Sequence, residues 1–270
     1  MPLNVKEVLL EAADFYKNNF NSLISLSLCY VLVMGPIVML VNFSDQISIT
    51  VTDESVVTFL MVSIMSATFV WLVLLIIFGP RFFLATMVLI HSLMNGQQIN
   101  LRMAYKMTKG KYWAIVGRML VIGILAFGGQ AFLASLLGLG FNIYFSLIFI
   151  AVVLSYFYLI YPLIALESNT KDALKRSSEM ITGNFIPVFI LYFLTTTLLN
   201  IVDNAVRDVL PNNLGILLVT GIVFWVLMFF LFPFAETVCV VVYRKLKGVE
   251  EPEEAEGFTS DEMNHNQDAF

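Results

Sequence analysis

Residues 174–185 read LKRSSEMITGNF, a mixed polar and apolar stretch between two long hydrophobic runs. Its apolar residues follow helical spacing, and Gly183 and Asn184 are of the types that end one helix and begin the next. We therefore predict a short amphipathic helix along the membrane surface, followed at Phe185 by a helix that enters the membrane.

The composition is that of a membrane protein. Hydrophobic residues make up 59% of the 270 positions and charged residues only 13%, so most of the surface must meet lipid or other helices. The net charge of −5 comes from the C-terminus, because eight of the 20 acidic residues lie in the last 21 positions. Residues 1–249 carry 12 acidic and 15 basic residues, and the basic ones are too scattered for a nucleic-acid surface.

Six apolar runs are long enough to cross a hydrocarbon core of about 30 Å. We expect spans at 22–43, 56–91, 113–137, 143–166, 186–202 and 214–243. Thirteen basic residues fall on one side of these spans, whereas only Arg207 falls in a loop on the other. The positive-inside rule then predicts that both termini are cytoplasmic. The membrane domain is expected to cover residues 1–249.

The entry stretch has two weaker copies earlier in the chain. Each copy spaces its residues as i, i+3, i+4, i+7 and i+11, which is one stripe of a helix ending on an aromatic residue. The three stripes are Leu9, Ala12, Ala13, Tyr16 and Phe20; Leu101, Ala104, Tyr105, Thr108 and Tyr112; and Leu174, Ser177, Ser178, Ile181 and Phe185. Phe20, Tyr112 and Phe185 are therefore the expected entry motifs.

Every second span contains a proline, at Pro80, Pro162 and Pro233, where we expect helix kinks. Together with the entry stretches, this pattern predicts an all-α polytopic membrane protein of three repeats. Each repeat, at about 4–92, 96–167 and 170–247, is an amphipathic interfacial helix followed by a transmembrane hairpin. The alternative is that the three stretches are ordinary basic loops, because any inner loop can offer an amphipathic entry segment.

Three segments carry a family resemblance: EAADFYKNNFNSLISLSL at 11–28, ALKRSSEMITGNFIPVFILYFLTTTLL at 173–199, and LFPFAETVCVVVYRKLKG at 231–248. They resemble the YciC-type family of uncharacterised bacterial inner-membrane proteins. A looser similarity is to the membrane domain of glycerophosphodiester phosphodiesterases, whose catalytic domain has no counterpart here. The resemblance implies a multi-pass location in the bacterial inner membrane and supplies no catalytic residues.

Arg81 and Glu236 are the ionisable residues that the sequence places deepest in the membrane. A charge at a helix centre costs ~2.5–3.5 kcal/mol on insertion scales, so such residues are usually paired or functional. Both follow a repeated proline, and we hypothesise that they pair inside the bundle. This pair would be either a structural link between helices or a polar site for an ion or small anion.

No catalytic, cofactor or metal-binding motif accompanies the hydrophobic runs. We therefore expect a non-enzymatic membrane component that organises or interacts with lipids or protein partners. The alternative is a transporter or channel for a small solute or ion, with a polar interior around Arg81 and Glu236. The acidic tail at 250–270 is expected to be disordered and cytoplasmic, and is a possible docking segment for a protein partner.

Overall fold

The computed structural model describes residues 3–29, 54–137, 143–209 and 214–248, which are helical and contain no strand. An unlabelled helix, Phe20–Cys29, follows α1. The labelled elements are α1 (Val5–Asn18), α3 (Glu54–Met94), α4 (Leu101–Met107), α5 (Tyr112–Gly123), η1 (Ile124–Gly128), α6 (Gly129–Leu137), α7 (Ile143–Tyr156), α8 (Ile160–Leu166), α9 (Ala173–Thr182), α10 (Phe185–Tyr192), η2 (Phe193–Thr197), α11 (Leu198–Val209) and α12 (Leu214–Lys247). The two η elements are π-helical.

Within these residues, four helical stretches are long and apolar enough to cross a membrane. They are Ile76–Met94, Tyr112–Leu133, Tyr144–Leu166 and Ile222–Lys247. A fifth is possible where α9 and the α10–η2 helix, bent by 106°, are taken as one broken span. Most of the expected first span, 22–43, and the whole acidic tail lie outside the described residues. The fold is therefore all-helical with four to five candidate spans, against the six expected.

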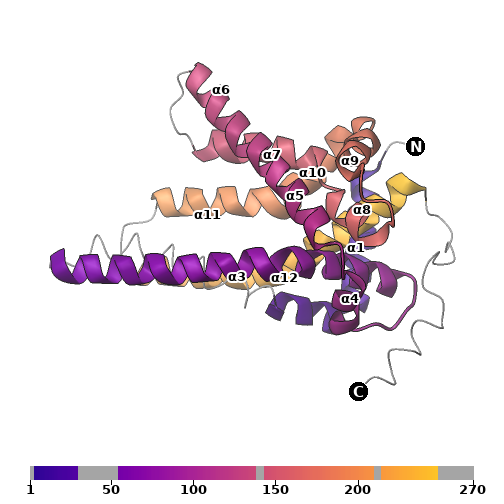
Figure 1. The fold of residues 1–270 in the computed structure, drawn as a ribbon, viewed down its shortest axis with the longest axis horizontal. Coiled ribbons are helices and arrows are strands. Elements are labelled where there is room, and N and C mark those ends of the chain that lie inside the picture. The colour runs from indigo at the N-terminus through magenta and orange to yellow at the C-terminus, as the bar shows by residue number, and fades with distance from the viewer. Residues whose placement is uncertain (1–2, 30–53, 138–142, 210–213, 249–270) are drawn as a thin grey trace.

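Large apolar side chains cover the outer surface of the long helices. Met65 and Phe69 of α3 are 71% and 68% exposed, and Val219 and Ile222 of α12 are 61% and 59% exposed. Water would penalise such a surface, whereas hydrocarbon accepts it. The exposed faces of α3 and α12, which run side by side in Figure 1, are therefore suited to contact with lipid.

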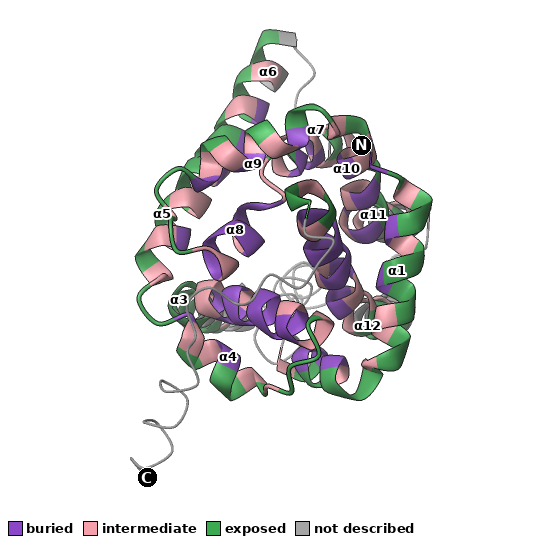
Figure 2. Cartoon of the chain, turned by 90° about the vertical axis from the view of Figure 1, so that its right-hand side faces the viewer, coloured by how far each residue is buried: buried purple, intermediate pink, exposed green. Residues whose placement is uncertain are grey.

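The core lies at the end of the molecule where α1, α4, α8 and α9 gather (Figure 1). Figure 2 shows the buried parts of α3, α8 and α12 inside this end, with α1, α4 and α9 around its rim. Aromatic contacts join the inner helices: Phe82 stacks on Phe232 at 6.4 Å, and Phe83 lies 5.6 Å from Tyr161, ring centre to ring centre. All three inner helices carry one of the repeated prolines.

All three expected entry aromatics begin a helix. Phe20 starts the helix that follows α1, Tyr112 starts α5, and Phe185 starts α10 after the turn at 183–184. In the sharpest case, α9 and α10 meet at 106°, as expected where a surface helix leads into the membrane. The two helices predicted on either side of residues 183–184 are present, and their placement relative to the membrane stays a prediction.

The entry helices dock through one equivalent small residue. Ala12, Ala104 and Ser177, at the second position of the three stripes, are each 0% exposed. A small side chain allows the backbone of one helix to approach another closely. Accordingly α1 packs against α12, α4 against α3, and α9 against α8. Each entry helix thus contacts the proline-bearing helix of another expected repeat. The entry helix of the first repeat contacts the third repeat, that of the second contacts the first, and that of the third contacts the second.

Side chains from other helices donate hydrogen bonds to backbone carbonyls near two of the prolines. Proline has no N–H, so it leaves the carbonyl four residues earlier without its helical donor. For Pro80 that carbonyl belongs to Ile76, and it accepts a hydrogen bond of 2.9 Å from the Tyr112 hydroxyl. For Pro162 it belongs to Tyr158, which accepts from the Cys239 thiol at 3.3 Å. These two carbonyls, which lie within candidate spans, therefore find donors on other helices.

Near Pro233, a tyrosine of α1 donates a similar hydrogen bond to a backbone carbonyl. The Tyr16 hydroxyl donates to the carbonyl of Phe230 at 3.2 Å, one residue away from the carbonyl that Pro233 frees. The helices α3 and α12 continue through their prolines, whereas the chain before Pro162 breaks into a turn at 157–159. Of the three proline sites, only Pro162 thus lies close to a break in the helix.

Candidate functional site

Arg81 and Glu236 do not form the ion pair that the sequence suggested. Arg81 turns toward α4, where its Nη2 donates to the carbonyl of Tyr105 at 2.9 Å. Its guanidinium carbon lies 4.1 Å from the centre of the Tyr105 ring, which is a cation–π contact. Salt bridges among the described residues include Lys175–Glu179, Arg176–Glu167 and Lys245–Glu11. In this part of the chain no salt bridge links Arg81 to Glu236.

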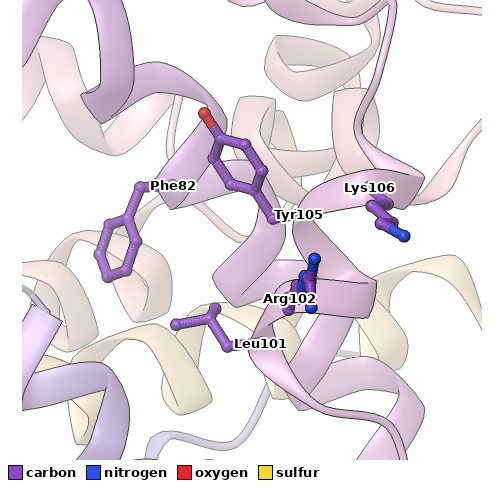
Figure 3. Close-up of a pocket in the computed structure, with 5 residues that line it drawn as sticks. All are labelled: Phe82, Leu101, Arg102, Tyr105 and Lys106. Carbon is purple, nitrogen blue, oxygen red and sulfur yellow. The ribbon is translucent and has the colours of Figure 1, made fainter. Parts of the chain in front are cut away.

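A pocket of about 480 Å³ opens beside this Arg81–Tyr105 contact. Phe82 of α3 and Leu101, Arg102, Tyr105 and Lys106 of α4 line it. Figure 3 shows the apolar side chains of Phe82 and Leu101 on one side of Tyr105, with Arg102 and Lys106 on the other. The pocket therefore combines an apolar wall with two cationic groups. Glu236 is not among its lining residues.

The end of α8 is held by a polar network around Glu167, whose side chain is 10% exposed. Both carboxylate oxygens accept from the guanidinium of Arg176 on α9, and Oε1 also accepts from the Tyr243 hydroxyl of α12 at 3.0 Å. A bidentate arginine–carboxylate pair fixes geometry as well as charge. Glu167 therefore ties α8, α9 and α12 together at one point.

Lys111 completes this network from the second entry stretch. Its Nζ donates to the carbonyls of Ala165 at 2.8 Å and Glu167 at 3.2 Å, which are among the carbonyls that the end of a helix leaves unpaired. Burial lowers the pKa of the Lys111 ammonium, and the nearby Glu167 carboxylate acts in the opposite direction. The lysine that precedes Tyr112 is thus a cap for α8.

Sequence reasoning missed Glu167, Tyr105 and Lys111 as participants in these sites. Glu167 stands at the end of an expected span, where a lone carboxylate is unremarkable. Its spacing of nine residues from Arg176 is not that of a same-helix pair. Only the path of the chain between α8 and α9 brings the two together. A signal was present for Lys111, which directly precedes an entry aromatic.

Taken together, these features describe an all-helical chain with apolar helices of membrane-spanning length, a partly cationic pocket and a polar network at one end. Comparison of the chain with family models, with curated proteins and with solved structures finds no match. No group of three or more His, Cys, Asp or Glu side chains is placed to hold a metal ion within the part of the chain that the structure describes.

Proposed function

We propose that this chain is a non-enzymatic, multi-pass component of the bacterial inner membrane that binds anionic lipid at the pocket between α3 and α4. It has six spans in three hairpins, with both termini in the cytoplasm and the three entry helices along the cytoplasmic face. The resemblance to the YciC-type family supports the location. The distribution of basic residues along the chain supports the orientation.

The observation that carries the lipid proposal is the composition of the pocket. Phe82 and Leu101 offer an apolar wall for glycerol and acyl carbons, while Arg102 and Lys106 offer positive charge for a phosphate. The pocket lies where a surface helix joins the membrane-length segment Ile76–Met94. A lipid also has its charged and apolar parts side by side at this level of a bilayer.

Removing the two cationic groups is expected to weaken binding of phosphatidylglycerol. Each Lys or Arg near an anionic lipid contributes about 1 kcal/mol, so the Arg102→Ala and Lys106→Ala double variant is expected to lose roughly tenfold or more in affinity. The measurement is native mass spectrometry of the detergent-purified protein, titrated with short-chain phosphatidylglycerol and, in parallel, with zwitterionic phosphatidylcholine.

The matched control removes two exposed lysines from another entry helix, as Lys6→Ala with Lys17→Ala on α1. Its affinity for phosphatidylglycerol is expected to stay within about twofold of the parent. Equal losses in the two double variants would show that only general surface charge matters. Equal affinity of the parent for the two lipids would also contradict the proposal.

The alternative function is transport of a small solute or ion. It is less well supported because Arg81 and Glu236 do not share one polar interior: Arg81 contacts Tyr105, and Glu236 lies on the side of Tyr158. What remains in favour of transport is Glu236 itself, a carboxylate within the membrane-length segment Ile222–Lys247.

A further inference from the structure

Glu236 occupies an unusual place for a carboxylate. It lies 11 residues before the end of α12, which is ~16 Å along a helix that rises 1.5 Å per residue. In the described part of the chain, no hydrogen bond or salt bridge reaches its carboxylate. An ionisable residue at membrane depth usually pairs, or else it serves a pathway or a bound ion.

Polar side chains from α12 and from two elements that pack against it lie in the same region as Glu236. Tyr158 and Tyr161 come from the chain that leads into α8, Tyr192 comes from the end of α10, and Cys239 lies one turn further along α12. The Tyr158 hydroxyl donates to the carbonyl of Ala235, the residue before Glu236, at 3.3 Å, and the Tyr158 ring centre lies 5.5 Å from that of Tyr192. The Cys239 thiol donates to the Tyr158 carbonyl at 3.3 Å. Their hydroxyl and thiol groups make this part of the bundle polar.

Two of the elements that pack against α12 have irregular backbone, and α12 itself contains a proline. The chain breaks between α7 and α8 at 157–159, the helix after α10 becomes π-helical at Phe193–Thr197, and Pro233 precedes Glu236 by three residues. Irregular backbone at membrane depth is tolerated where it is buried in protein or lines a polar cavity. In transporters, such interrupted helices form the sites of coupling ions, and π-helical turns are frequent at functional sites.

No cation among the described residues pairs with Glu236. On α3, Phe82 stacks on Phe232 and Arg81 contacts Tyr105. On α1, Tyr16 donates to the Phe230 carbonyl, and Glu11 pairs with Lys245. A cation that neutralised Glu236 would therefore have to come from solution.

We propose that Glu236 is the charged ligand of a site for a small monovalent cation, either a proton or a sodium ion. Oxygen atoms of the neighbouring tyrosines and of the irregular backbone segments supply the remaining contacts, which suits a hard cation. This site is separate from the lipid pocket and does not depend on it.

The test is carbodiimide labelling of the purified full-length protein. Dicyclohexylcarbodiimide adds to a protonated carboxyl group in apolar surroundings: the carboxyl oxygen bonds to the carbodiimide carbon and the proton moves to nitrogen, with no leaving group. Peptide mass mapping reports the adduct on Glu236, and the Glu236→Gln variant identifies it by its loss. Glu167, held by Arg176, is the internal control and is expected to stay unmodified.

Labelling is expected to fall as pH rises, by about tenfold per unit once most of a single carboxyl is ionised. If sodium is the ligand, sodium chloride is expected to slow labelling several-fold relative to potassium chloride at the same pH. Dependence on pH alone assigns a proton site, and protection by sodium assigns a sodium site. Labelling that is equal in all these conditions, or no adduct on Glu236 in any of them, would overturn the proposal.

Discussion

Replacing Glu167 with alanine is expected to lower the free energy of unfolding by roughly 2–4 kcal/mol. The change removes both acceptors of Arg176 and the acceptor of Tyr243 at once. Tyr243 is 1% exposed, so its hydroxyl would be left buried without this partner. The side chain of Arg176 is 37% exposed, and water would soften the loss of its charge partner. The expected loss of unfolding free energy is therefore smaller than for a fully buried ion pair.

Thermal and denaturant unfolding of the detergent-purified protein, followed by circular dichroism, measures this loss. The matched control is Glu179→Ala, which breaks the exposed i, i+4 pair with Lys175 and is expected to change stability by less than about 0.5 kcal/mol. If the two variants prove equally stable, Glu167 does not hold the ends of α8, α9 and α12 together.

Leu84→Ala is expected to lower the free energy of unfolding by about 2–4 kcal/mol. Leu84 is 0% exposed and belongs to the core where α3, α8 and α12 meet. Truncating it leaves a cavity that the surrounding helices can fill only in part. Because apolar lipid removes most of the transfer term inside a membrane, lost packing contacts account for most of this effect.

Leu72→Ala on the same helix is the matched control. Leu72 is 41% exposed on the outer surface of α3, where lipid or detergent replaces the lost contacts, and a change below about 1 kcal/mol is expected. Both variants are compared by unfolding in the same detergent. A loss at Leu72 as large as that at Leu84 would mean that the outer surface of α3 is packed against protein.

Helix starts and ends could be predicted from the sequence because residues next to them determine where they fall. Helical spacing over residues 174–185, with Gly183 and Asn184 after it, predicts where α9 ends and α10 begins. The same reasoning located the helix starts at Phe20 and Tyr112. The prolines were recognised, but the donors to the carbonyls they free, Tyr112 and Cys239, come from other helices and have no signal in the spacing.

The expected Arg81–Glu236 pair was wrong for a physical reason. Similar depth along two helices does not fix the direction in which each side chain points. The prediction also considered only charged partners, whereas a backbone carbonyl or an aromatic ring can bind an arginine as well. Tyr105 offers Arg81 both. Two of the six expected spans are not among the four counted. Most of 22–43 lies outside the described residues, and the straight α10–η2 segment, Phe185–Thr197, is too short to count as a span without α9, which is bent away from it.

The central claim is that α1, α4 and α9 lie along one face of the membrane around the proline-bearing helices. Its most direct test is accessibility to a membrane-impermeant maleimide, in inside-out and right-side-out vesicles, of single cysteines in a protein with Cys29 and Cys239 replaced by alanine. The exposed probe sites are Lys6→Cys, Lys109→Cys and Glu179→Cys, and Ser135→Cys near the end of α6 is the control for the opposite face. The first three are expected to react only from the cytoplasmic side and Ser135→Cys only from the other. Reaction of any of the three entry sites from the side that labels Ser135→Cys would contradict the account.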